Sequence, residues 1–236
     1  DLAAHQVIVA GLQSLTPEIP IISEESAPPS FAQRSQWTRY WLVDPLDGTK
    51  EFVNRNGEFT VNIALIDGHD AVFGVVGVPV QNKVYVGDVN QSDLSLRAYV
   101  EINGDKHLLP GKSYDEDAKA VRVVASRSHG GERLESYLAE LASQFADCER
   151  RPVGSSLKLC VLAEGGADIY PRLGPTSEWD IGAAQAVLTA AGGGVYQPDG
   201  ESLAYNTKES LLNPEFLAVG DASYPWRERL PAFPAR

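Results

Sequence analysis

Two aspartates three positions apart follow an apolar run that predicts a buried strand. Asp44 and Asp47 stand in a segment, residues 41–52, that runs Trp-Leu-Val-Asp-Pro-Leu-Asp-Gly-Thr-Lys-Glu-Phe. Because Pro45 cannot donate a ladder hydrogen bond and Gly48 permits a tight turn, we expect both carboxylates to project from one strand end. Two carboxylates this close repel each other unless a proton or a cation lies between them. Such hard oxygen ligands suit Mg²⁺, although an Asp-rich turn that caps a helix is an equally open interpretation.

A second acidic strand end lies upstream. Residues 19–23 form a short apolar run that predicts a strand, and Glu24 and Glu25 follow it directly. Adjacent acids after a strand usually belong to a solvated loop, but two acidic strand ends close together in the chain favour a shared site. A helix that begins at Gly48 and Thr49 would direct free backbone N–H groups at an anion.

Three segments of the second half carry polar residues at predicted strand or helix ends. Asp180 lies near the start of an alanine-rich helix, in Thr-Ser-Glu-Trp-Asp, where a capping box is the simpler explanation. Ser126 and His129 follow a predicted strand, where parallel-sheet proteins place binding loops, although a loop histidine is more often a surface residue. Gly154 and Lys158 lie where another strand turns into a helix, a position that suits either a phosphate contact or a solvated lysine.

The order of predicted elements divides the chain into two parts. Residues 1–115 predict one helix followed by an antiparallel sheet that carries the acidic strand ends. Residues 116–236 alternate strands and helices, which favours a mostly parallel, helix-covered sheet whose strand ends carry the candidate binding loops. The polar stretch 110–119 is the expected linker. The chain contains no methionine and begins at Asp1 inside a helical pattern, so we expect an N-terminal segment to be missing.

The individual elements are predicted from hydrophobic periodicity and from glycine and proline positions. Strands are expected at 19–23, 39–44, 59–66, 71–78, 82–88, 94–102, 121–125, 148–153, 167–170 and 216–219. Helices are expected at 2–15, 134–145, 155–164 and 178–191.

Composition and missing motifs limit the possible functions. The net charge of −12 argues against binding a nucleic acid polymer or an anionic membrane through a basic face, and it requires cations around any anionic substrate. No apolar run approaches the roughly 20 residues that span a bilayer, and two cysteines give no disulfide framework, which fits the cytoplasm. G-x-S-x-G, Asp-x-Asp-x-Thr, Walker A and G-x-G-x-x-G motifs are all absent. Metal-assisted hydrolysis remains as the favoured chemistry.

The acidic segments, taken together, resemble a family signature. Glu-Glu at 24–25, Asp-Pro-Leu-Asp-Gly-Thr at 44–49 and Trp-Asp at 179–180 resemble, in order and spacing, the inositol monophosphatase-like, Mg²⁺-dependent, lithium-sensitive phosphatases. Within that superfamily the chain is similar, over nearly its whole length, to the CysQ-type 3′(2′),5′-bisphosphate nucleotidases. Three more segments carry this likeness: Ser-Arg-Ser-His at 126–129, Gly-Ser-Ser-Leu-Lys at 154–158 and Tyr-Pro-Arg at 170–172. Lys-Glu-Phe at 50–52 departs from the inositol monophosphatases and points away from inositol phosphate.

The resemblance implies a fold and a set of site residues. The fold is an α+β or α/β five-layer αβαβα sandwich of the inositol monophosphatase and fructose-1,6-bisphosphatase type, here without its N-terminal part. Its metal ligands would be Glu24, Asp44, the Leu46 carbonyl, Asp47 and Asp180, which gives Asp180 a role beyond capping. Its catalytic residues would be Asp1, Thr49 and Glu25. Thr49 would orient the attacking water together with Asp1. Its substrate contacts would be Glu24, Leu46, Asp47, Gly48, Thr49, Ser126, His129, Gly154, Lys158 and Asp180.

The resemblance also implies an activity. We expect a phosphatase that uses two or three Mg²⁺ ions and an activated water to hydrolyse adenosine 3′,5′-bisphosphate to AMP and phosphate, in sulfur assimilation and nucleotide recycling. The alternatives are an inositol or sugar monophosphatase of the same superfamily and a nucleotide-binding sensor without turnover. We further expect a small-molecule nucleotide as partner, no nucleic acid polymer, no transmembrane segment, a monomer or homodimer, and a cytoplasmic location that includes the periphery of the inner membrane.

Overall fold

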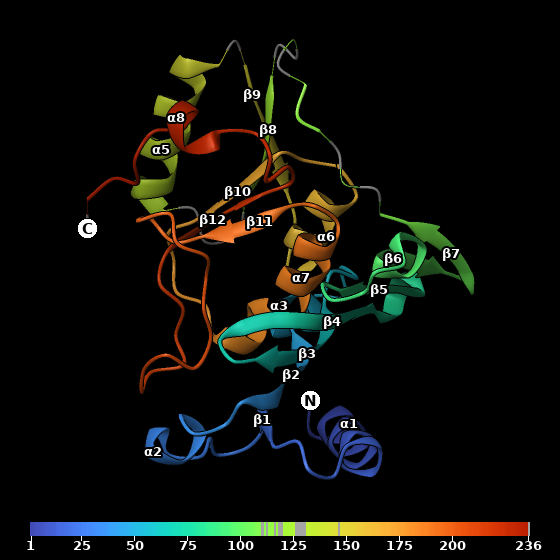
Figure 1. Cartoon of the computed structure of the whole chain (residues 1–236). Helices are drawn as coiled ribbons and strands as arrows, with labels where there is room; N and C mark the ends of the chain where they lie inside the picture. Colours follow the sequence, from blue (N-terminus) through green and yellow to red (C-terminus); the bar gives the residue numbers. More distant parts are fainter. Residues whose placement is uncertain are drawn as a thin grey trace.

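The chain folds into alternating layers of helix and sheet (Figure 1). The structure is a computed structural model that describes residues 1–109, 111, 113–115, 117, 120–125, 131–145 and 147–235. Its two sheets divide between the two halves of the chain: seven strands come from the first half and five from the second.

The first sheet follows the order of its strands in the sequence, β1-β2-β3-β4-β5-β6-β7. The strands are β1 (Ile21–Ser23), β2 (Arg39–Asp47), β3 (Thr60–Asp67), β4 (Asp70–Val78), β5 (Lys83–Asp88), β6 (Ala98–Ile102) and β7 (Asp105–Leu108). Short helices α2 (Phe31–Arg34), α3 (Thr49–Val53), α4 (Leu94–Arg97) and the 3₁₀ turn η1 (Pro79–Gln81) connect them. The antiparallel prediction is confirmed from β2 onward, whereas β1 pairs with β2 in parallel.

The predicted strand at 94–102 is correct only in its second half. Residues 94–97 form α4 instead, because Asp93 caps this helix by accepting a hydrogen bond from the Ser95 N–H at 2.9 Å. An aspartate at this position favours a helix start over a continuing strand.

The second sheet has the order β11-β12-β10-β8-β9. Its strands are β8 (Val121–Ala125), β9 (Cys148–Pro152), β10 (Ile169–Arg172), β11 (Gly194–Tyr196) and β12 (Phe216–Val219). The prediction of a mostly parallel sheet is wrong, since β8 pairs in parallel with β9 and β10 while β12 runs antiparallel to both of its neighbours. Parallel neighbours need a crossover, usually a helix, and residues 197–215 between β11 and β12 contain none.

Five helices build the layers around these sheets (Figure 1). They are α1 (Leu2–Leu15), α5 (Gly131–Gln144), α6 (Leu157–Ala163), α7 (Glu178–Ala190) and α8 (Trp226–Arg229). Helix α1 packs on the outer face of the first sheet, where Leu12 joins Trp41 and Val43. Helices α6 and α7 lie between the sheets, and α5 and α8 cover the outer face of the second sheet. The predicted αβαβα sandwich is confirmed.

Small residues let α7 lie very close to the first sheet. A Cβ on Gly74 of β4 would come within 2.1 Å of the Ala183 carbonyl oxygen. Helix α7 is buried along almost its whole length, with alanines on several sides. This close fit fixes where the first turn of α7, which carries Asp180, meets the strands of the first half.

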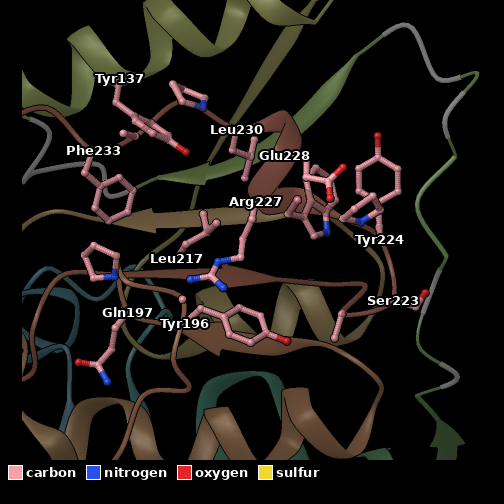
Figure 2. Close-up of a pocket in the computed structure, with 17 residues that line it drawn as sticks. Tyr137, Tyr196, Gln197, Leu217, Ser223, Tyr224, Arg227, Glu228, Leu230 and Phe233 are labelled. Atoms are coloured by element: carbon pink, nitrogen blue, oxygen red, sulfur yellow. The ribbon is translucent and has the colours of Figure 1, made fainter.

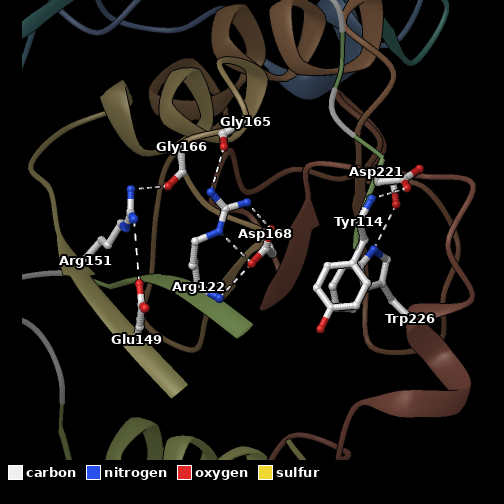
Figure 3. A network of polar contacts seen from close by, with 9 residues as sticks. All are labelled: Tyr114, Arg122, Glu149, Arg151, Gly165, Gly166, Asp168, Asp221 and Trp226. Carbon is white, nitrogen blue, oxygen red and sulfur yellow. Dashed lines mark hydrogen bonds and ion pairs between the residues drawn. The ribbon is translucent and has the colours of Figure 1, made fainter. Parts of the chain in front are cut away.

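A partly buried ion pair holds β10 beside β8 (Figure 3). The Arg122 guanidinium contacts the Asp168 carboxylate at 2.5 Å and donates to the Gly165 carbonyl oxygen at 2.9 Å. The Arg122 backbone N–H also donates to Asp168, at 2.7 Å. Because Asp168 directly precedes β10, this pair positions the strand that carries Tyr170 and Arg172.

The predicted division of the chain at residue 115 stays a prediction. The first sheet ends at Leu108 and the second begins at Val121, so the predicted linker falls between them. Residues 110, 112, 116, 118 and 119 of that linker lie outside the described residues. Within the described part of the chain, no helix is long and apolar enough to cross a membrane.

Candidate metal and substrate site

Three aspartates from both halves of the chain meet between the two sheets. Carboxylate oxygens of Asp44, Asp47 and Asp180 lie within 4.8 Å of one another. Asp44 is buried, with 1% of its surface exposed, and the other two are half-buried. The sequence predicts these three residues as ligands, and the structure brings them together, although their role as metal ligands stays a prediction.

The two aspartates of β2 are presented by an irregular strand end. Strand β2 continues to Asp47, which pairs with Thr60, and the register shifts between Asp44 and Asp47. The predicted strand at 39–44 therefore ends too early, because a bulge places Pro45, which has no N–H, outside the regular pairing and lets the strand continue. The Leu46 backbone N–H donates to Asp44 Oδ1 at 3.0 Å and thereby orients this carboxylate. The Leu46 carbonyl stays a predicted ligand.

Asp180 both caps a helix and faces the acidic cluster. Its Oδ2 accepts the Ser177 backbone N–H at 2.8 Å, and the Ser177 side chain completes the capping box at the start of α7. A carboxylate has several lone pairs, so this bond leaves acceptor capacity for a cation. The capping interpretation is thus confirmed, and it is compatible with the predicted metal role.

Asp47 is oriented by the loop that precedes α6. The Ser156 backbone N–H donates to Asp47 Oδ2 at 2.5 Å across 109 positions of the sequence. The Ser156 hydroxyl contacts the Thr60 hydroxyl and donates to Asn62 Oδ1, both at 2.8 Å. All three of these supporting polar side chains are buried.

Sequence reasoning missed this support. A signal for it exists in β3, where Thr60 and Asn62 occupy the alternate positions that face the core. Polar residues on a buried strand face require partners, which here belong to the site.

The electrostatics of the cluster fit a divalent cation. Burial, followed by repulsion from Asp47 and Glu24, raises the pKa of Asp44 far above its ordinary value. Burial raises the pKa of Asp47 as well, while Lys158 and the Ser156 N–H act in the opposite direction. Burial and repulsion from Asp47 raise the pKa of Asp180 to about 7. Carboxylates that cannot all ionise together without a counter-charge form the oxygen donor set that Mg²⁺ uses.

The acids of the β1 end occupy different positions. Glu24 is exposed, yet its carboxyl group shares a hydrogen bond with Asp44 and raises the pKa of that group. Its backbone N–H donates to the Val43 carbonyl oxygen at 3.1 Å, which extends the β1–β2 pairing to the acidic end. Glu25 is half-buried, and its catalytic role stays a prediction.

Thr49 and Asp1 are both exposed. Thr49 begins α3 and lines the same cavity as Asp47, whereas Asp1 lies at the start of α1 and has no side-chain hydrogen bond to the helix that it precedes. Their pairing around a water stays a prediction.

A cavity of about 280 Å³ opens in front of the aspartates. Its walls come from α3, from the loop before α6, and from β10 and the first turn of α7. Gly48, Gly154 and Lys158, which the sequence predicts as substrate contacts, all line it. Ser126 and His129 lie outside the described residues.

Two cations balance the acids of this cavity. Lys158 is 6% exposed, and its ammonium donates to the Ser155 carbonyl oxygen at 3.0 Å. Burial lowers the pKa of Lys158 to about 8, with Asp47 acting against this shift and Arg172 adding to it. Arg172 was not among the predicted site residues, although it belongs to the Tyr-Pro-Arg segment. Its guanidinium donates to the carbonyl oxygens of Gly174 and Pro175, at 3.1 and 2.8 Å, and no ion pair involves it in the described part of the chain.

A layered sandwich with clustered acids beside paired cations defines a class, the metal-dependent phosphatases of this αβαβα architecture. A family model described as "Inositol monophosphatase family" matches residues 1–227. The chain belongs to the inositol monophosphatase family.

The relatives of the chain share a narrower name. The protein from Escherichia coli strain K12 named "3′(2′),5′-bisphosphate nucleotidase CysQ" is 46% identical over 219 residues, which cover 92% of this chain and 82% of that protein. The CysQ of Buchnera aphidicola is 42% identical and is covered over 78% of its length. The crystal structure of CysQ from Bacteroides thetaiotaomicron superposes with a TM-score of 0.80 at 40% identity, covering 91% of this chain and 81% of that one. Inositol monophosphatase II from Staphylococcus aureus, at 17% identity and a TM-score of 0.73, shares the fold.

Proposed function

We propose that this protein is a Mg²⁺-dependent 3′(2′),5′-bisphosphate nucleotidase, which hydrolyses adenosine 3′,5′-bisphosphate to AMP and phosphate. The observation that carries the proposal is that Asp44, Asp47 and Asp180 meet, and that Asp47 and Asp180 line one cavity together with Lys158 and Arg172. Relatives that bear this activity in their names match 92–96% of the chain at 35–48% identity. The activity belongs to sulfur assimilation and nucleotide recycling.

The aspartate carboxylates hold the Mg²⁺ ions, and backbone N–H groups orient these carboxylates. Asp44, Asp47 and Asp180 are the ligands, with Glu24 and the Leu46 carbonyl beside them. When bound, Mg²⁺ neutralises phosphate oxygens and makes a water molecule more acidic, so that it can attack phosphorus. The backbone N–H groups of Leu46, Ser156 and Ser177 keep the three carboxylates pointing at one centre. Two or three such ions are expected.

The side-chain cations Lys158 and Arg172 can bind a second phosphate of the substrate. Lys158 and Arg172 face the cavity without a carboxylate ion pair among the described residues, so they are available to an anionic group. Held by two backbone carbonyls, the Arg172 guanidinium presents its remaining N–H donors in a fixed direction. A monophosphate of an uncharged polyol would offer these cations no second anionic group. The cation pair therefore favours a bisphosphate.

The nucleoside lies beyond Arg172. A second hollow of about 490 Å³, between β10 and the start of α5, shares Tyr170 and Arg172 with the first cavity. A nucleotide that places its scissile phosphate at the aspartates and its other phosphate at Arg172 reaches this second hollow with its sugar and base. Gly48, Thr49 and Gly154 then lie on the side of the scissile phosphate.

A substrate comparison tests the proposal. With Mg²⁺, we expect kcat/KM for adenosine 3′,5′-bisphosphate to exceed that for inositol 1-phosphate by about 100-fold or more, which is about 2.7 kcal/mol of transition-state preference. Asp47→Asn should abolish turnover, because an amide lacks the negative charge that binds Mg²⁺. A preference for inositol 1-phosphate would make the protein an inositol phosphatase, and tight nucleotide binding without phosphate release would make it a sensor.

Lys158→Met tests the place of the second phosphate. We expect KM for adenosine 3′,5′-bisphosphate to rise about tenfold or more, while kcat/KM for a singly phosphorylated 3′-nucleotide falls much less, because only the bisphosphate uses this charge. Equal losses on both substrates would contradict the assignment.

A further inference from the structure

A large hollow lies on the far side of the second sheet from the acidic cluster (Figure 2). Its volume is about 670 Å³, and the C-terminal segment that includes α8 closes it against α5, β11 and β12. This volume falls within the range of small-molecule sites. None of the residues around it belongs to the proposed phosphatase site.

The walls of the hollow are largely apolar and include several aromatic rings. Tyr137 of α5 and Phe233 of the C-terminal segment pack edge to face with ring centroids 5.2 Å apart, and Leu217 and Tyr196 lie below them in Figure 2. Tyr137 is completely buried, and its hydroxyl has no hydrogen-bond partner among the described residues. Tyr196, Leu217 and Phe233 are only partly buried, so their side chains form the accessible part of this wall.

A single guanidinium reaches into the centre of the same space. Arg227 of α8 extends between Leu217 and Tyr196 (Figure 2), where it donates to the Asp199 carbonyl oxygen. In the described part of the chain no carboxylate forms an ion pair with it. Glu228, the acidic residue that also borders the hollow, points away from this guanidinium in Figure 2. The interior therefore combines aromatic rings with one positive charge.

We propose that this hollow is a second ligand site, which binds a small aromatic anion: one or two rings joined to a carboxylate, sulfonate or phosphate. The rings of such a ligand would pack among Tyr196, Leu217 and Phe233, and its anionic group would accept hydrogen bonds from Arg227. An uncharged aromatic molecule would leave the guanidinium without its best partner, and a small inorganic anion would leave the apolar walls uncovered. Only a molecule with both parts uses the whole site.

The site also borders the strand that leads to the phosphatase cavity. Leu217 pairs with Pro171 across the β10–β12 ladder, and Pro171 lies between Tyr170 and Arg172 in the sequence. Binding in the hollow is nevertheless separate from the proposed activity, because the two groups of residues do not overlap.

The test uses 8-anilinonaphthalene-1-sulfonate, an aromatic sulfonate, with the full chain in isothermal titration calorimetry and fluorescence. We expect one site per chain. Arg227→Gln, a substitution of an exposed residue, should weaken binding about tenfold, as expected for the loss of a charge-assisted hydrogen bond. Ala232→Trp, which fills the hollow from its exposed edge, should abolish binding. Arg229→Gln is the matched control, because Arg229 is exposed on the same helix but does not border the hollow.

Two results would overturn the proposal. One is binding to Arg227→Gln within twofold of the unaltered protein, or an equal loss in Arg229→Gln. The other is loss of binding in Lys158→Met, which would place the probe in the phosphatase cavity. Circular dichroism of each variant verifies that it is folded, and Arg227→Gln decides the question if Ala232→Trp does not fold. Failure of the phosphatase assay with retained probe binding would count against the proposed activity alone.

Discussion

Replacing the buried Arg34 should destabilise the protein and weaken its use of Mg²⁺. Arg34 belongs to α2, in the segment between the Glu24 loop and β2, and is 2% exposed. Its guanidinium donates to Asn206 Oδ1 and to the carbonyl oxygens of Lys208 and Glu209. The Asn206 backbone N–H in turn donates to both Glu178 carboxylate oxygens, at 3.1 and 3.0 Å. This chain of contacts ties α2 to the first turn of α7.

The size of the effect follows from burial. Arg34→Met removes three hydrogen bonds from a charged group and leaves the buried side chain of Asn206 without this donor. It also removes a nearby positive charge that lowers the pKa of Glu178, which burial raises to about 7. Removing one partner from a buried charged network costs about 3–5 kcal/mol. For a chain of this length each kcal/mol corresponds to about 2–4 °C, so the melting temperature should fall by about 6–20 °C.

The assay combines thermal unfolding with a Mg²⁺ titration of activity. Because Asp180 lies two positions after Glu178, we expect Arg34→Met to raise the Mg²⁺ concentration for half-maximal activity several-fold at a temperature where it remains folded. Arg39→Met is the matched control: Arg39 pairs with Asp67 at 2.6 Å, but its side chain is 59% exposed, so its loss should cost at most about 1 kcal/mol. If the two variants lose equal stability, or if only Arg39→Met changes the Mg²⁺ dependence, the reasoning is refuted.

Two further changes test the site. In EDTA, the stability of the fold should decrease as the pH rises from about 5 to about 8, and Mg²⁺ should remove this decrease. Folding raises the pKa of Asp44 and Asp180, so the folded state holds protons that it loses as the pH rises through these values. A melting temperature that rises with pH in EDTA would contradict this reasoning. Gly154→Ala should lower kcat/KM about tenfold or more, because a Cβ would meet Glu58 and Glu51 side-chain atoms at 2.9 Å and displace the loop before α6. In the control Gly11→Ala, where a Cβ would meet nothing within 4 Å, kinetics should be unchanged and stability should rise by up to about 1 kcal/mol.

Local patterns predict much of the first sheet correctly. The period-two alternation of residues 59–66 becomes β3, whose alternate side chains are buried, because strand faces follow from the sequence directly. The helix at 178–191 and its capping box also follow from neighbouring residues. Errors arise where a nearby residue or a distant partner changes the outcome. Asp93 turns residues 94–97 into a helix, and β12 enters the second sheet antiparallel to β10.

The sequence by itself determined the local chemistry of this protein: two aspartates at one strand end, an acid pair at another, and an aspartate in a helix cap. Their spacing along the chain is short-range information that side-chain types and turn residues carry. The resemblance implied that Asp180 joins Asp44 and Asp47, and the tertiary structure shows how they meet; only the tertiary structure decided that Ser156 orients Asp47 across 109 positions and that Arg172 lies near enough to lower the pKa of Lys158. The physical reason is packing, because these encounters depend on how closely α7 lies against the first sheet and on where Arg122 and Asp168 hold β10.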